Sequence, residues 1–137
     1  MGTTYAEITL KNSFDESKAR EGLIKEEEIR SVIVEAIVDT GAMTLVINEE
    51  LCQKLGLAIT KERYAMVANG ERVKCQETEP VDIQWKDRGA TVGAYVIPGA
   101  KKVLLGAIPL EYMDLIVNPV TRELVGAHGD IIETLIL

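Results

Sequence analysis

The chain has 137 residues, of which 47% are hydrophobic and 27% charged, so it can form one domain with a real core (residues 1–137) but not two. Its net charge of −7 argues against nucleic acid as a partner, because phosphate binding needs a basic surface. No run of 18 apolar residues occurs, which predicts no membrane span and no membrane partner.

The first half of the chain predicts short strands around one helix. Strands are predicted at residues 4–10, 29–38 and 43–47. Residues 11–28 are polar and end in Glu26-Glu27-Glu28, an acidic run that predicts a solvated loop or a hairpin end. Asn48 is a typical helix N-cap and Gly56 a typical stop, so a short helix is expected between them.

The second half begins with a hairpin centred on Asn69-Gly70, a pair that favours a type I′ turn with positive φ at both residues. Its strands lie within residues 63–77. Further strands are predicted at residues 81–85, 90–97 and 103–105, a brief helix at 109–113, a hairpin from 115–117 and 123–125, and an apolar tail at 131–137. The fold class is therefore all-β, or mainly β with one or two short helices.

Two cysteines and one histidine restrict the chemistry of the chain. Cys52 and Cys75 lie far apart, which argues against a zinc site and predicts two free thiols. No serine or cysteine elbow motif accompanies His128, which we interpret as a surface loop residue. The first residues lack the basic start and apolar stretch of a secretory signal, so we expect a cytoplasmic protein. We also expect no metal and no cofactor.

The most informative segment is Val38-Asp39-Thr40-Gly41-Ala42, which follows an apolar run. An unpaired charge at the end of a buried strand is costly, so Asp39 is either well hydrogen-bonded or the working group of a site. A second apolar strand, Val103-Leu104-Leu105-Gly106-Ala107, follows about 65 residues later.

The Asp-Thr-Gly-Ala motif, the Asn69-Gly70 hairpin and the strand ending at Gly106 occur in an order that resembles the retropepsin-like aspartic proteases, over about residues 30–126. The small prokaryotic members of that group are the most similar. The resemblance implies a closed β-barrel of the acid protease fold, a symmetric homodimer, and hydrolysis of peptide bonds in extended polypeptides without a cofactor.

Such hydrolysis needs a base that activates water and an acid that protonates the substrate, and two adjacent carboxylates supply both. The chain has five other aspartates, and none of them stands in a matching sequence context: Asp15, Asp82, Asp87, Asp114 and Asp130. The second carboxylate is therefore expected to be Asp39 of another copy. Gly41 allows the sharp turn, and the resemblance implies that Thr40 hydrogen-bonds across the dimer axis.

The hairpin corresponds to the flap of these proteases, which closes over the substrate. Predicted substrate-binding residues are Ala42, Met66, Val67, Ala68, Asn69 and Gly70. In pepsin-like relatives a hydroxyl residue usually stands at the position of Ala42. Alanine cannot donate a hydrogen bond to the carboxylates, so we expect activity nearer mildly acidic or neutral pH than in pepsin.

Alternatives remain at this point. Asp-Thr-Gly also occurs in plain turns and in phosphotransfer motifs, although no glycine-rich phosphate loop accompanies it here. The chain could also be a catalytically weak or inactive dimeric module that binds extended peptides in the same groove. The apolar tail could join a dimer sheet or form an edge strand within the domain.

Overall fold

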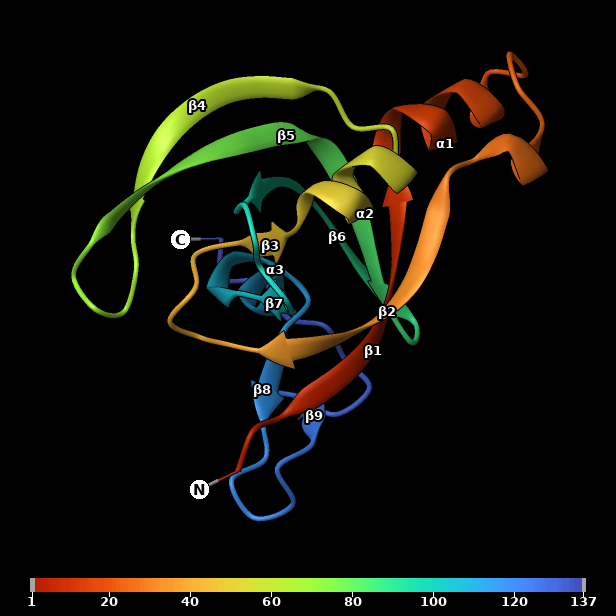
Figure 1. The fold of residues 1–137 in the computed structure, drawn as a ribbon. Coiled ribbons are helices and arrows are strands. Elements are labelled where there is room, and N and C mark those ends of the chain that lie inside the picture. Colours follow the sequence, from red (N-terminus) through yellow and green to blue (C-terminus); the bar gives the residue numbers. More distant parts are fainter. Residues whose placement is uncertain (1, 137) are drawn as a thin grey trace.

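Apolar residues alternate along most strands of this chain and fill the interior of a closed barrel in the computed structural model, which describes residues 2–136 (Figure 1). The strands are β1 (Tyr5–Asn12), β2 (Ser31–Val38), β3 (Leu45–Ile47), β4 (Ile59–Met66), β5 (Arg72–Trp85), β6 (Arg88–Val96), β7 (Val103–Leu105), β8 (Leu115–Val117) and β9 (Leu124–Gly126). The helices are α1 (Ser13–Arg20), α2 (Glu49–Lys54) and α3 (Ala107–Tyr112), with a 3-10 turn η1 (Glu26–Glu28). The predicted mainly-β class is confirmed.

The barrel closes because β1 pairs with β2 along one side and with β5 along the other. Among the described residues, six strands follow one another around it in the order β1-β2-β7-β3-β6-β5. This confirms the predicted closed β-barrel. β4 pairs with β5 outside the closed ring, and these two strands arch away from the barrel as a long hairpin (Figure 1).

β7 lies between β2 and β3, parallel to the first and antiparallel to the second. The two strands that flank Asp39 in the sequence are therefore separated by a strand from much later in the chain. Val38 pairs with Leu105, and Leu45 pairs with the same residue from the other side. The turn between β2 and β3 is held from beneath by β7.

The core is built from aliphatic side chains that the strands direct inward at every second position. Ile8 and Leu10 of β1 face Val81 and Ile83 of β5, and all four are almost fully buried. The helix expected between Asn48 and Gly56 is present as α2, and the Asn48 side chain accepts a hydrogen bond from the Leu51 amide as its N-cap.

The polar segment 11–28 contains α1 and η1, and the acidic run at 26–28 is exposed as expected but forms a 3-10 turn instead of a loop or hairpin end. Asn12 caps α1 by accepting a hydrogen bond from the Asp15 amide. The buried Asp15 carboxylate receives the Arg30 guanidinium at 2.8 and 2.9 Å. These hydrogen bonds lower the pKa of Asp15 and fasten the helical arm, which projects at the upper right of Figure 1, to the start of β2.

Element boundaries also differ from the sequence predictions. β5 continues through Pro80, because a register shift against β6 between Glu77 and Pro80 accommodates the missing amide donor. α3 begins at Ala107 rather than at 109. In the apolar tail, Ile131 makes an isolated bridge with His128, and residues 132–136 form no strand. The tail is therefore not an edge strand within the described part of the domain. Leu137 lies outside the described residues.

The hairpin tip is not the predicted type I′ turn. Gly70 has a φ of 86°, but Asn69 is not among the residues with positive φ. The Gly70 amide donates to the Val67 carbonyl, and the Val67 amide donates to the Glu71 carbonyl, both at 2.9 Å. This pattern is typical of a three-residue loop in which only the last residue is left-handed.

Candidate active site

Asp39 stands directly after β2, and its carboxylate is held by the turn that follows. The Asp39 amide donates to the Leu105 carbonyl at 2.9 Å. The Gly41 amide donates to Oδ1 of Asp39 at 2.9 Å, and the Ala42 amide donates to the Asp39 carbonyl at 3.1 Å. The carboxylate is therefore fixed by the backbone of its own turn, while its side chain stays partly exposed.

The start of α3 supports this turn from below. The Ala107 amide donates to the Ala42 carbonyl at 2.8 Å, and the Ile108 amide donates to the Met43 carbonyl at 2.9 Å. At Gly106, an added Cβ would lie 2.3 Å from the Thr44 carbonyl oxygen and 2.5 Å from that of Ala42. The close approach of the two backbones requires glycine at this position.

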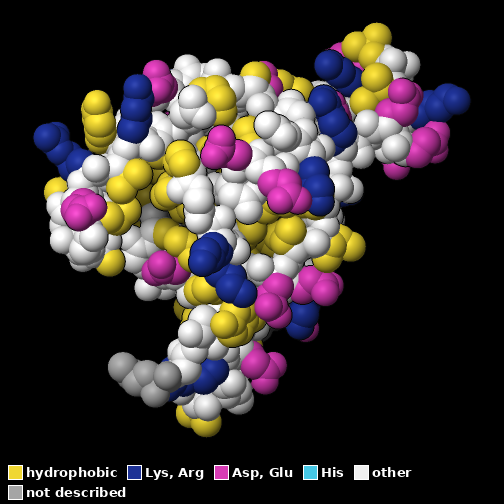
Figure 2. All heavy atoms as spheres, viewed as in Figure 1, with side chains coloured by type: hydrophobic (Ala, Val, Ile, Leu, Met, Phe, Trp, Pro, Cys, Tyr) yellow, Lys and Arg dark blue, Asp and Glu magenta, His cyan; other side chains and the backbone are white. Residues whose placement is uncertain are grey.

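A groove of about 670 Å³ separates the Asp39 turn from the β4–β5 hairpin. Six of the nine predicted site residues line it: Asp39, Gly41, Ala42, Met66, Val67 and Ala68. Three do not: the exposed Thr40, beside Asp39, and Asn69 and Gly70 at the hairpin tip. Figure 2 shows hydrophobic side chains gathered beneath the arch of the hairpin, at the left of the view.

The groove also contains residues that the sequence did not indicate. Tyr95 of β6 and Arg63 of β4 lie in its lining. No local motif marks these residues, because the pairing of β4 with β5 and of β5 with β6 brings them together. The signal that was available is the alternation along each strand, which separates residues facing the barrel from those facing away.

Asp39 is the one carboxylate among the described residues that line this groove. Asp15 is bound by Arg30, and Asp114 is bound by His128. A single chain therefore presents one carboxylate in this groove. Among residues 2–136, no three His, Cys, Asp or Glu side chains gather in a way that could hold a metal ion.

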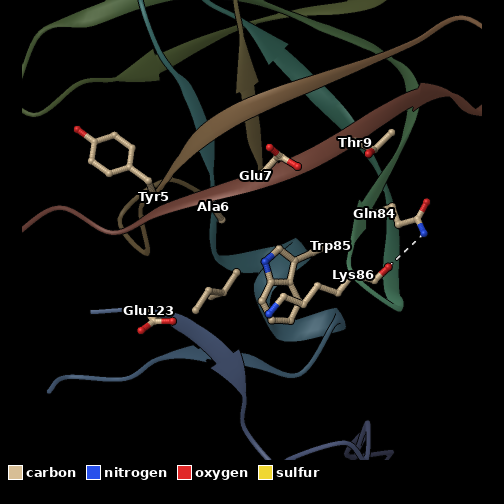
Figure 3. A pocket seen from close by; sticks show the side chains of 9 residues that line it. Tyr5, Ala6, Glu7, Thr9, Gln84, Trp85, Lys86 and Glu123 are labelled. Carbon is tan, nitrogen blue, oxygen red and sulfur yellow. Dashed lines mark hydrogen bonds between the residues drawn. The ribbon is translucent and has the colours of Figure 1, made fainter. Parts of the chain in front are cut away.

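A second hollow of about 480 Å³ lies between β1, the β5–β6 turn and β9 (Figure 3). Its Lys86 ammonium group stands over the Trp85 ring, 4.7 Å from the ring centroid. Glu7 lies on β1 and Glu123 in the loop before β9, and their side chains do not converge on one point in Figure 3. This hollow therefore does not present two adjacent carboxylates.

His128 lies in a loop, partly exposed as expected, but it does not stand alone. Its Nδ1 lies 2.7 Å from Oδ2 of Asp114, and its Nε2 lies 3.3 Å from Oε2 of Glu133. The hydrogen bond with Asp114 raises the pKa of His128, and the same bond lowers the pKa of Asp114. This cluster lies outside the Asp39 groove.

The sequence profile of a family described as gag-polyprotein putative aspartyl protease matches residues 26–111, which is more than half of the chain. The matched range contains the Asp39 turn, the β4–β5 hairpin and β7. A search among curated proteins finds no match. No helix within the described residues is long and apolar enough to cross a membrane.

Proposed function

The chain belongs to the gag-polyprotein putative aspartyl protease family, and from this premise we propose that it is an aspartic endopeptidase that acts as a homodimer. The observation that carries the proposal is the Asp39 carboxylate, held by the Gly41 amide at 2.9 Å in a groove about 670 Å³ in volume with no other carboxylate in its lining. A twofold axis beside Asp39 supplies the missing group, since symmetry places the same residue on both sides of it.

In the proposed reaction, a water molecule lies between Asp39 and Asp39 of the partner subunit. Two like charges at short distance do not both ionise easily, so the two carboxylates share one proton. The ionised carboxylate removes a proton from the water, which attacks the peptide carbonyl carbon. The protonated carboxylate donates to the carbonyl oxygen, and a proton then passes to the leaving nitrogen.

The neighbouring residues have supporting roles in this proposal. Thr40 is exposed beside the carboxylate and is free to hydrogen-bond with the partner subunit across the axis. The β4–β5 hairpin covers the groove and excludes water when an extended polypeptide is bound. Asn69 and Gly70 at its tip would contact the substrate during closure, although they do not line the open groove.

The proposal requires no cofactor and places the protein in the cytoplasm. Cys52 and Cys75 are both free and buried, which is compatible with a reducing compartment. With Ala42 beside the site, we expect the activity to lie at mildly acidic to neutral pH, because alanine donates no hydrogen bond to the carboxylates.

The test is cleavage of a diverse octapeptide library by the purified protein over about pH 3 to 8, with products identified by mass spectrometry. We expect Asp39→Asn to reduce turnover by at least about 1,000-fold with an unchanged circular dichroism spectrum, since it removes the acid–base group. Asp87→Asn is the matched control, because Asp87 is exposed in the β5–β6 turn, away from the groove.

One observation favours a second candidate function. β4 stands at the end of the sheet order and pairs with β5 alone among the described strands, so its other edge is open to an extended peptide. A dimeric module could bind polypeptides there without cutting them. Peptide binding by the native protein, with no cleavage product at any pH tested, would favour this function over the endopeptidase.

A further inference from the structure

The groove holds one cation whose role the Asp39 chemistry does not explain. Arg63 lies on β4 directly opposite Cys75 of β5, and Cys75 is buried and lines the groove. Directly opposed residues in a sheet point to the same face, so the Arg63 side chain also points toward the groove. Asp39 and Arg63 are the charged residues among the described residues of the lining.

The Arg63 guanidinium is held in place next to the catalytic turn. Its Nη1 donates to the Tyr95 hydroxyl at 2.9 Å, and its Cζ lies 5.9 Å from the centroid of the same ring. The Tyr95 hydroxyl in turn donates to Sδ of Met43 at 3.7 Å. Met43 follows Asp39 by four residues, so a continuous series of contacts connects the cation to the carboxylate turn.

The charge of Arg63 is only partly neutralised. Its Nε lies 3.6 Å from a Glu77 oxygen, and Lys61 lies 3.7 Å from the other oxygen of the same carboxylate. Two cations therefore share one anion. A guanidinium has five N–H donors, and within the described chain Tyr95 is the one hydrogen-bond acceptor that it reaches. Its side chain is 50% exposed, so a ligand has access to the remaining donors.

We propose that Arg63 is a specificity-determining residue that binds the carboxylate of an Asp or Glu side chain in the bound polypeptide. The proposal rests on the proposed function of the groove. Most of the remaining lining is apolar, including Val46, Ile97 and Leu104. The groove therefore selects an extended segment that combines an apolar side chain with an acidic one. A guanidinium binds a carboxylate through two parallel hydrogen bonds. The neutral side-chain amide of a glutamine in the peptide cannot form the same charged pair.

The experiment uses two octapeptide libraries that are N-acetylated and C-amidated. Both contain the same apolar residues, and one contains Glu wherever the other contains Gln. We expect the native protein to cleave peptides with Glu at one position relative to the cut about tenfold faster, in kcat/KM, than the matched Gln peptides. Arg63→Gln should bring this ratio to about one.

Arg72→Gln is the matched control. Arg72 stands on the same hairpin and packs over the Tyr64 ring in a similar way, 5.8 Å from its centroid, but it does not line the groove. The Glu-to-Gln ratio should stay at its native value in this variant. A purely structural role for Arg63 would lower stability or turnover without changing the ratio, and that result would overturn the proposal.

A binding measurement separates this proposal from the endopeptidase proposal. Immobilised Asp39→Asn protein captures peptides from the two libraries without cutting them, and the captured peptides are identified by mass spectrometry. Enrichment of Glu peptides that is lost in Asp39→Asn/Arg63→Gln supports the subsite, even if the native protein proves inactive. Equal capture of both libraries contradicts it.

Discussion

At the scale of single residues, Gly106 determines how closely β7 and α3 approach the Asp39 turn. The position is not left-handed, so the requirement for glycine comes from space alone. Two carbonyl oxygens, those of Ala42 and Thr44, occupy the volume that a Cβ would need. Because both oxygens belong to the backbone of the segment after Asp39, neither can move without moving that segment.

We predict that Gly106→Ala lowers the free energy of unfolding by about 3 kcal/mol, as overpacking against backbone does. It should also reduce peptide cleavage, because the displaced turn carries Asp39. Urea unfolding followed by circular dichroism measures the stability. Gly2→Ala is the control, since a Cβ there meets its nearest neighbour, an Arg122 nitrogen, at an ordinary 3.9 Å. Equal stability of the two variants would show that the turn relaxes without strain.

At the scale of elements, the segment after β9 is anchored by Asp114, His128 and Glu133. Oδ2 of Asp114 accepts a hydrogen bond from the Glu133 amide at 3.0 Å in addition to its bond with His128. Arg88 of β6 is buried and donates to the Met113 and Asp114 carbonyls at 2.9 Å and also to that of Gly129. The loop is therefore joined to both α3 and the barrel.

This anchoring should depend on pH. The pKa of His128 is raised by Asp114, so its contribution is fully present below its ordinary pKa of about 6.5 and is lost as pH rises through the raised value. The pKa of Asp114 is lowered by His128, so its contribution is fully present above its ordinary pKa of about 3.9 and is lost as pH falls through the lowered value. The groups around His128 are Asp114, Glu133 and Arg88.

Hydrogen exchange of the Glu133 amide, corrected for its intrinsic pH dependence, measures the effect. We expect the strongest protection between about pH 4 and 6.5, with weaker protection above that range. In His128→Gln, which does not titrate, the loss of protection at higher pH should disappear. An identical pH profile in this variant would assign the effect to another group.

The elements also show which parts of the fold could be predicted from the sequence. The β-strands and the Asn48 cap follow from local patterns, and the Asp-Thr-Gly motif locates the Asp39 turn. α1 was missed because one of its anchors is not local: Asp15 is paired with Arg30 across fifteen residues. Arg63 was missed for the same reason, since Tyr95 reaches it only through strand pairing.

At the scale of the whole molecule, one chain contains one groove carboxylate, so activity should require two copies. We predict that activity per milligram falls as the protein is diluted below the dissociation constant of the dimer. Adding an excess of Asp39→Asn protein should also inhibit the native protein, because mixed dimers carry a single carboxylate. Cleavage rates over a dilution series, with albumin as the inert control, measure both effects. Two results would contradict the dimeric site. One is activity that stays proportional to concentration at every dilution, and the other is activity that does not change when Asp39→Asn protein is added.

The position of β7 between β2 and β3 also has a consequence for the order of folding. The Asp39 turn is closed by the Leu105 carbonyl and by the Ala107 and Ile108 amides, which are synthesised about 65 residues after it. During translation, the turn cannot take its final shape until that segment has left the ribosome. A nascent chain interrupted before Leu105 would carry Asp39 without the backbone that positions it. Asp39 therefore reaches its final position only when most of the protein has been synthesised.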